Sequence, residues 1–278
     1  MKNLEQPLAS VLQSHDSWLI LTGAGCSTKA GLGDYRDKNG DWKRPQPITG
    51  QTFRNDELAR KRYWARGFVG WTHFASATPT SSHNALAQLQ QRINSPYLIT
   101  QNVDHLHQQA GHTGVIDLHG LLGQVICLHC NELTTRVQMQ ERLSNKNPWL
   151  NDLDAAYAPD GDADLEDDIT DSVIVPTCNQ CGGMLKPNVV FFGENVPRDK
   201  VNTCFDALDK AAGLLVVGSS MMVYSGFRFC RKAHELGKTI VIVNNGITRA
   251  DSMASIKVEG ECGAALQTAV EQIPTLSA

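Results

Sequence analysis

Residues 18–27 read WLILTGAGCS, an apolar run that leads directly into two glycines. A strand followed by such glycines and then by a helix lets backbone N–H groups approach a pyrophosphate at the helix N-terminus. Thr28 stands where the G-x-G-x-x-G pattern has its third glycine, so a simple tight turn is the alternative. The pattern predicts a dinucleotide-binding loop that contains Gly23, Ala24, Gly25 and Ser27.

Further apolar runs, several of them β-branched, follow at residues 97–99, 189–192, 214–217 and 239–243. Such near-continuous apolarity indicates strands that are covered on both faces. Helical patterns lie between them, at residues 83–92 and 227–236. Strands that alternate with helices predict a doubly wound parallel sheet, which is a Rossmann-like α/β fold.

Glycines and polar side chains follow the apolar runs, and in a doubly wound sheet ligands bind beyond the carboxyl ends of the strands. Gln101, Asn102 and Asp104 offer amide and carboxylate groups suited to a carboxamide and a ribose, although an Asx turn or helix cap is the alternative. We expect a glycine-bearing loop with Asp34, Tyr35 and Arg36 to fold over the nucleotide as a mobile lid. Other strand ends carry Gly218, Ser219, Ser220, Asn244 and Gly246.

Two stretches interrupt the alternation of strands and helices. Residues 36–75 are basic and aromatic and predicted to be partly helical, and residues 126–184 contain two cysteine pairs. We predict that residues 1–35, 76–125 and 185–278 form the nucleotide-binding domain, whereas residues 36–75 and 126–184 form a smaller domain. Residues 152–171 include nine acids and no Lys or Arg, which predicts a solvated, mobile loop.

Two Cys-x-x-Cys pairs are made by Cys127 with Cys130 and by Cys178 with Cys181. Four thiolates in paired turns suit a closed tetrahedral zinc site. The gap between the pairs is longer than in the usual zinc ribbon, and a redox dithiol is the alternative. Because four cysteines leave no open coordination position, we predict one structural Zn²⁺.

Length and composition exclude several classes of protein. The 278 residues can bury a stable core without disulfides. The formal charge of −4 gives no basic footprint for nucleic acid. The first residues lack the character of a secretory or transit peptide, and the apolar runs are far too short to span a bilayer. We expect a cytoplasmic protein with no nucleic-acid or membrane partner, and leave its oligomeric state open.

His119 ends a short β-like run directly before the first cysteine pair, at the predicted junction of the two domains. A histidine at such a junction is suited to transfer protons near neutral pH. A purely structural role is the alternative for any single histidine. We therefore expect His119 to be the candidate proton-transfer residue of the site.

Taken in order, these motifs resemble those of the sirtuin family, which are NAD-dependent protein lysine deacylases. The matching segments are residues 23–27, 34–36, 100–104, 118–120, 186–194 and 218–220, together with the two cysteine pairs. The resemblance covers nearly the whole chain. Residues 63–66, 158–162 and 223–226 are similar to the class II branch, to which the fourth human sirtuin belongs.

The resemblance implies that NAD is consumed as a co-substrate and that acylated-lysine proteins are the substrates. It implies that residues 23–36 are the cofactor loop and that Gln101, Asn102 and Asp104 hold nicotinamide and its ribose. A substrate peptide would add as a strand between residues 189–194 and the region of Val223. The implied adenosine residues are Gly218, Ser219, Ser220, Asn244, Gly246 and Cys262, and the implied peptide residues are Val189, Phe192, Gly193, Glu194 and Val223.

The family resemblance also implies a mechanism, with His119 and Asn102 as catalytic residues. The acyl oxygen of the modified lysine displaces nicotinamide from the ribose. His119 then deprotonates a ribose hydroxyl, and the reaction releases free lysine and O-acyl-ADP-ribose. Mono-ADP-ribosyl transfer to protein is the alternative activity, and a non-catalytic NAD sensor and a dehydrogenase are further alternatives.

Two features bear on how this chain would differ within the family. Leu32 and Gly33 precede Asp34 where the family usually has Ile-Pro, which predicts a more flexible cofactor loop. Tyr63 and Arg66 have a spacing that resembles the pair of acid-selective sirtuins, so Arg66 could bind a terminal carboxylate on the acyl group. A solvated basic helix face is the alternative, and acetyl is the expected default substrate.

Overall fold

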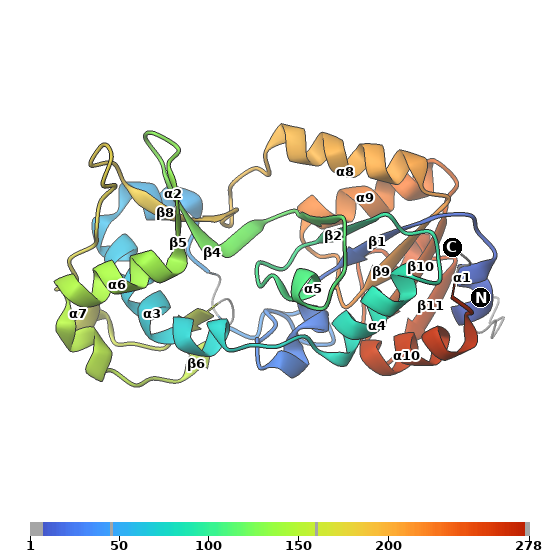
Figure 1. The fold of residues 1–278 in the computed structure, drawn as a ribbon, viewed down its shortest axis with the longest axis horizontal. Helices are drawn as coiled ribbons and strands as arrows, with labels where there is room; N and C mark the ends of the chain where they lie inside the picture. The colour runs from blue at the N-terminus through green and yellow to red at the C-terminus, as the bar shows by residue number, and fades with distance from the viewer. Residues whose placement is uncertain (1–7, 45–46, 159–160, 276–278) are drawn as a thin grey trace.

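The structure is a computed structural model that describes residues 8–44, 47–158 and 161–275. A large lobe is built on a six-stranded sheet, and a smaller lobe lies to one side of it (Figure 1). Within the segment 158–162, Pro159 and Asp160 lie outside the described residues. Among the helices of the described ranges, none has the length and apolar character needed to cross a bilayer.

All six strands of the large sheet are parallel and follow the order β11-β10-β9-β1-β2-β3. This is the doubly wound 3-2-1-4-5-6 order, with its switch point between β1 and β9, where a ligand crevice opens. The predicted Rossmann-like fold is therefore confirmed. The strands are β1 Trp18–Thr22, β2 Tyr97–Thr100, β3 Val115–Asp117, β9 Gly213–Val217, β10 Thr239–Asn244 and β11 Ile256–Glu259.

Alternate side chains of the strands supply two hydrophobic cores, one on each face of the sheet. Ile20 belongs to the core under α1 Leu8–Gln13, α4 Ser81–Gln90 and α10 Cys262–Gln272. Leu19 belongs to the core under α8 Arg198–Lys210 and α9 Tyr224–Glu235. Figure 1 shows these two helical layers on opposite sides of the sheet. Because both faces are covered, β1 and β9 are buried along their full length.

The small lobe contains an antiparallel sheet of β5 Leu133–Thr135, β4 Gly120–Cys127 and β8 Leu185–Val189. Phe53 and Trp64 from the first insertion share one buried core with Met139 and Leu143 from the second. The other elements of this lobe are α2 Gly50–Asn55, α3 Glu57–Ala75, α6 Arg136–Lys146, η3 Pro148–Asp152, β6 Tyr157–Ala158, β7 Asp162–Ala163 and α7 Asp167–Thr170. Short helices beyond the strand ends of the large lobe are η1 Ala24–Cys26, η2 Thr28–Ala30, α5 Leu106–Gln109 and η5 Asp251–Met253.

Most predicted elements are present, but the apolar run at 189–192 is not a strand of the large sheet. β8 ends at Val189 and pairs with β4. After it, Val190 N–H donates to the His119 carbonyl at 2.8 Å, and Phe192 bridges to Thr49. The run is apolar because it passes between two cores: Phe191 is buried in the small-lobe core, and Val190 packs against the large-lobe core. β3 lies in the short β-like run predicted before His119, whereas β11 was not predicted, because Lys257 interrupts its apolar pattern.

Two sequence expectations for the small lobe need comment. The predicted boundary between residues 125 and 126 falls inside β4, and β8 lies beyond the predicted boundary at residue 185 although it pairs with β4. The expectation that residues 152–171 form a solvated, mobile loop is wrong for part of this segment. Its described residues include β6, β7 and α7, and Asp162 is held by an ion pair with Arg66.

Candidate active site and zinc centre

A cleft of about 1490 Å³ lies between the two lobes, beyond the carboxyl ends of β1, β2 and β9. It is lined by almost all of the residues that the sequence predicts for cofactor and substrate. Ser27, Asp104 and Gly246 are the exceptions among the predicted residues, and they support side chains or backbone that do line the cleft. The tertiary fold thus gathers segments from residue 23 to residue 262 at one site.

The glycines after β1 allow two loops to pack backbone against backbone. Gly25 N–H donates to the Gly218 carbonyl at 2.8 Å. A Cβ on Gly25 would lie 2.9 Å from Gly218 Cα, and a Cβ on Gly23 would lie 2.7 Å from Ser219 Cβ. Gly218 itself has a φ of 60°, which favours glycine. The glycines therefore keep the loop backbone at the cleft surface, where it can approach a dinucleotide pyrophosphate.

Asn102 is held by both of its amide hydrogens. Its Nδ2 donates to Ser27 Oγ at 3.0 Å and to the Gly23 carbonyl at 3.1 Å. Ser27 Oγ in turn donates to Asp104 Oδ2 at 2.6 Å, and the other oxygen of Asp104 accepts from Leu106 N–H at 3.0 Å. Asp104 thus forms an Asx turn just before α5 as well as joining the site. Because both N–H donors of Asn102 are used, its carbonyl oxygen is the group it can offer to a ligand hydroxyl.

Gln101 acts as a brace between neighbouring strand ends. Its Nε2 donates to the Thr22 carbonyl at 3.1 Å and to Ser219 Oγ at 2.9 Å. A Cβ on Gly226 would come within 2.5 Å of Gln101 Oε1, so the first turn of α9 packs directly against this amide. The side chain of Gln101 therefore fixes β1, β9 and α9 relative to one another.

His119 lies at the end of β3 and faces the cleft. Its Nδ1 lies 2.8 Å from the Gln101 carbonyl oxygen, and its Nε2 lies 2.8 Å from Ser225 Oγ. Burial is the main cause that lowers the pKa of His119 to about 4. The hydrogen bond to Gln101 acts in the opposite direction, and the charges of Lys200 and Arg228 lower the pKa further. The imidazole is therefore neutral at physiological pH, as a general base requires.

The predicted lid residues Asp34, Tyr35 and Arg36 belong to a segment, residues 34–44, that folds as a small hairpin. Lys43 N–H donates to the Tyr35 carbonyl at 2.9 Å, and the Lys43 ammonium pairs with Asp34. The guanidinium of Arg36 lies 4.1 Å from the centroid of the Trp42 ring. Trp42 also packs edge-on against Phe192, with ring centroids 5.6 Å apart. These contacts connect the cofactor loop to the predicted peptide-binding segment.

The predicted adenosine residues come from three strand ends or helices: Gly218, Ser219 and Ser220 follow β9, Asn244 ends β10 and is followed by Gly246, and Cys262 begins α10. Asn244 Nδ2 donates to the Gly246 carbonyl at 3.2 Å. The buried Cys262 thiol donates to the Val243 carbonyl at 3.4 Å. Glu261 accepts hydrogen bonds from Gly263 and Ala264 N–H groups and so caps α10. The carboxylate of Glu261, which the sequence analysis did not single out, also lines the cleft.

Glu194 fixes the shape of the predicted peptide-binding segment. One of its oxygens accepts from Phe191 N–H at 2.9 Å and pairs with the Lys186 ammonium at 3.1 Å. The other oxygen pairs with Arg54. Gly50 N–H donates to the Phe192 carbonyl at 3.0 Å, which ties the segment to α2. The Glu194 side chain therefore fixes the backbone of this loop, and Glu194 lines the cleft together with Val189, Phe192 and Gly193.

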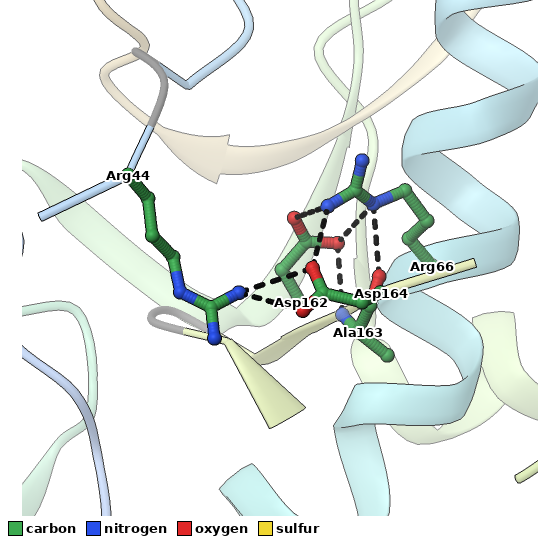
Figure 2. Close-up of polar contacts among 5 residues, drawn as sticks. All are labelled: Arg44, Arg66, Asp162, Ala163 and Asp164. Atoms are coloured by element: carbon green, nitrogen blue, oxygen red, sulfur yellow. Dashed lines mark hydrogen bonds and ion pairs between the residues drawn. The ribbon is translucent and has the colours of Figure 1, made fainter. Parts of the chain in front are cut away.

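Arg66 lies on the cleft wall with its charge matched by two aspartates (Figure 2). Its Nε and Nη2 each lie 3.1 Å from one oxygen of Asp162, and its Nη2 lies 3.4 Å from Asp164. Asp164 also accepts from Arg44 at 2.8 and 3.0 Å. Nearby, Tyr63 packs edge-on against Phe191 at 5.1 Å. The alternative of a simple solvated face does not describe Arg66, because its guanidinium is bound within the protein.

The four predicted metal ligands, Cys127, Cys130, Cys178 and Cys181, lie together in the small lobe, with all four sulfur atoms within 4.8 Å of one another. The pairs Cys127–Cys181 and Cys130–Cys178 are 3.5 and 3.7 Å apart. Tetrahedral zinc with bonds of about 2.3 Å separates its sulfur ligands by about 3.8 Å. A Cβ on Gly183 would lie 2.9 Å from Cys127 Sγ, so this glycine makes room for the cluster. The donor set is positioned for one structural metal ion, consistent with zinc.

Several residues of the site carry no signal in the sequence. Ser225 meets His119, Trp42 covers Arg36, and Gly183 borders the metal cluster. Thr80 N–H donates to His83 Nδ1 at 3.1 Å, so His83 Nε2 carries the proton that points to Ser27 Oγ at 3.5 Å. Ser225 and His119, Gly183 and Cys127, and His83 and Ser27 are each more than 50 residues apart in sequence, so local patterns do not reveal these contacts.

Comparison with known proteins gives a consistent result. The model of the Sir2 family matches residues 23–225. An NAD-dependent protein deacetylase of Xanthomonas campestris is 52% identical over 259 residues, which is 93% of this chain and 88% of that protein. NAD-dependent protein deacetylase 2 of Bradyrhizobium diazoefficiens is 52% identical over 262 residues, or 94% and 96% of the two chains.

The fold is also similar to that of a Sir2 protein in complex with a p53 peptide and NAD⁺. The TM-score is 0.77 at 28% identity, and the alignment covers 98% of each chain. The family resemblance that the sequence motifs predict is confirmed by a family match that includes the glycine loop, His119 and both cysteine pairs. This chain belongs to the Sir2 family, the sirtuins.

Proposed function

We propose that this protein is an NAD-dependent protein lysine deacetylase. The observation that carries the proposal is the position of His119. Its neutral imidazole faces the same cleft as the glycine loop of β1 and the Asn102 amide. A dinucleotide-binding loop and a general base are thereby combined in one cavity, as cleavage of NAD by an acyl-lysine requires.

Bound NAD would supply an electrophilic ribose carbon, from which nicotinamide leaves as the acyl oxygen of the lysine bonds to it. The backbone of Gly23, Ala24 and Gly25 would hold the phosphates. Asn102 would accept a hydrogen bond from a ribose hydroxyl, since its own donors are used by Gly23 and Ser27. The cleft walls of both lobes would shield the sugar from water until the acyl group has attacked.

His119 would take the proton from a ribose hydroxyl, so that the hydroxyl oxygen attacks the acyl carbon. Its low pKa keeps Nε2 unprotonated before this step, and the Gln101 carbonyl accepts a hydrogen bond from Nδ1–H, which stabilises the imidazolium that forms. Water then completes the transfer, so that free lysine and O-acyl-ADP-ribose are released. This assigns His119 the role of the catalytic base and makes NAD a consumed co-substrate.

The acylated lysine would enter between residues 189–196 and residues 223–225, which line opposite sides of the cleft. An extended peptide can bind there by main-chain hydrogen bonds, which tolerate varied sequences. Acylated-lysine proteins are therefore the proposed partners. Because four free thiolates need a reducing compartment to hold a metal, we place the activity in the cytoplasm.

For the acyl group, the pairing of Arg66 favours acetyl over dicarboxylic groups. A terminal carboxylate would have to approach a guanidinium that already binds Asp162 and Asp164. It would meet two negative charges as well as one positive charge, and like charges at this separation repel. We therefore propose that Tyr63 and Arg66 form a wall of the acyl pocket that does not select for acidic groups.

The test is mass spectrometry of acetyl-lysine peptides incubated with the protein and NAD. We expect loss of the acetyl group and release of nicotinamide with the wild type, and no product with His119→Tyr. His234→Tyr is the matched control, because this exposed histidine lies near the end of α9, away from the cleft. Label from NAD on protein instead of on a soluble product would indicate ADP-ribosyl transfer and contradict the proposal.

A further inference from the structure

Ser225 makes a hydrogen bond to His119 that the proposed reaction does not use. The two residues are 106 positions apart in sequence, and Ser225 Oγ lies 2.8 Å from His119 Nε2. Ser225 is the second residue of α9 and lines the cleft. The nitrogen that it contacts is the one that must accept a proton from the ribose.

The direction of both hydrogen bonds follows from the chemistry of the partners. The Gln101 carbonyl can only accept, so His119 Nδ1 carries the ring proton. Nε2 of the neutral ring is then a lone pair that can only accept. The Ser225 hydroxyl must therefore donate to Nε2, which fixes the tautomer that a general base needs.

The position of Ser225 is fixed by its neighbour in the helix. Gly226 packs so closely against the Gln101 side chain that a Cβ would meet Oε1 at 2.5 Å and Cδ at 2.8 Å. Gln101 also supplies the carbonyl that holds His119 Nδ1. One residue, Gln101, thus positions the imidazole through its backbone and α9 through its side chain. This shared contact brings Ser225 and His119 together.

The charges around the ring favour the neutral imidazole of His119, as the hydrogen bond from Ser225 does. Arg228 from α9 and Lys200 from α8 both disfavour a positive imidazolium. Lys200 Nζ donates to the Asp117 carbonyl at 2.5 Å, and the Asp117 carboxylate is bound by Gln108 at 3.0 and 3.1 Å. A hydroxyl that donates to Nε2 stabilises the neutral ring further, because the imidazolium has no lone pair to accept it.

We propose that Ser225 is a positioning residue for His119: its hydroxyl occupies Nε2 in the free protein and is replaced there by the ribose hydroxyl of bound NAD. The exchange replaces one O–H donor by another, so the ring keeps its tautomer and its orientation. This inference rests on the proposed role of His119 as the catalytic base. Once NAD is bound, Ser225 has no contact with the substrate, the cofactor or His119 Nε2 in this scheme.

Removal of the hydroxyl has two expected consequences. In Ser225→Ala the neutral ring loses a donor, so the pKa of His119 should rise by roughly half a unit to one unit. The ring of the free protein also loses one of its two restraints, so kcat/KM for NAD should fall about 3- to 10-fold. The kcat under saturating substrates should stay within about twofold, because the ribose hydroxyl has then replaced Ser225 at Nε2.

The first readout is ¹⁵N NMR of the histidine side chains across pH in the full-length protein, with the His119 signal identified by its loss in His119→Gln. We expect a hydrogen-bonded Nε2 and an Nδ1–H tautomer in the wild type. Ser225→Ala should change the Nε2 signal and raise the titration midpoint, whereas Ser225→Thr, which keeps the hydroxyl, should restore both. Thr203→Ala on α8 is the control, because its exposed hydroxyl bonds only to Asp199 in its own helix among the described contacts.

The second readout is the pH profile of acetyl removal for the same variants. A loss of kcat/KM for NAD in Ser225→Ala that Ser225→Thr recovers, together with the NMR shift, supports the proposal. An unchanged Nε2 signal and titration midpoint in Ser225→Ala would overturn it, whatever the rates are. Because the NMR measurement needs no turnover, it tests Ser225 separately: absence of deacetylation in the wild type would refute the proposed function alone.

Discussion

Replacement of Asp162 and Asp164 by asparagine should convert the acyl pocket to one that accepts acidic groups. Arg66 is bound by both carboxylates, at 3.1 and 3.4 Å, and the side chains of Arg66 and Asp162 are 32% and 39% exposed. The double variant keeps the size of the side chains but removes both negative charges. The Arg66 guanidinium then becomes available to a carboxylate at the end of a succinyl group.

The size of the effect follows from the exposure of the pair. A hydrogen-bonded charge pair is worth about 1.5–3 kcal/mol, and partial exposure to solvent reduces this to about 1 kcal/mol for each carboxylate. In the double variant Arg66 loses both charged partners, although the asparagine amides can still form weaker hydrogen bonds to it. The net change should favour binding of the succinyl group by about 1–2 kcal/mol. Since 1.4 kcal/mol is a factor of ten, the ratio of kcat/KM for succinyl over acetyl peptide should rise about 5- to 30-fold.

The assay is competition between acetyl and succinyl forms of one peptide sequence, followed by mass spectrometry. Asp171→Asn is the matched control. Asp171 belongs to the same acidic segment, but its carboxylate pairs with Arg62 and not with Arg66. Addition of Arg66→Ala to the double variant should abolish the gain. A ratio that stays within twofold of the wild type in the double variant would refute the idea that Arg66 faces the acyl group.

Three other perturbations have expected outcomes. Cys181 is an exposed member of the four-cysteine cluster, and Cys181→Ser should reduce bound zinc below one ion per chain. It should also lower Tm by about 10 °C, because metal binding contributes to folding stability. An unchanged zinc content would contradict the four-cysteine site. Gly25→Ala should raise the KM for NAD about tenfold, because the added Cβ would clash with the Gly218 backbone. Gly123→Ala is the control, because its Cβ would lie in open space. Equal KM values for the two variants would contradict the packing of the two loops. The acid limb of kcat/KM should lie near pH 4–5, because the base is active only when neutral and the pKa of His119 is about 4. A midpoint near pH 6.5, the ordinary histidine value, would show that burial does not control this group.

Much of the fold could be predicted because its signals are local. The runs at 18–21 and 214–217 are apolar at every position, since both faces of a parallel strand are covered. The run at 189–192 has the same composition, and the strand predicted there is wrong, because Phe191 is buried in the small-lobe core and Val190 packs against the large-lobe core without joining the large sheet. Composition reports that a segment is buried, and it does not report which neighbour covers it. The likeness of residues 63–66 and 223–226 to the class II branch stays a prediction.

The candidate site shows the same division. The roles of Gly23 and Gly25, and the grouping of the four cysteines, followed from spacing within short segments, since turns and metal ligation restrict nearby residues. The structure changed the reading of Gln101 and Glu194, which brace the cleft through their side chains. Sequence alone could not distinguish a side chain that holds a ligand from one that holds the ligand's neighbours.

The sequence by itself determined the Rossmann-like sheet, the glycine loop, the zinc ligands and the family, because each is encoded in short local motifs, even where these motifs lie far apart in the chain. Only the tertiary structure decided that Ser225 meets His119 and that Asp162 neutralises Arg66, across separations of 106 and 96 residues. Such pairs depend on where the large and small lobes place whole elements. The free energy that fixes those elements comes from burial of the cores, which specifies no particular polar pair in advance.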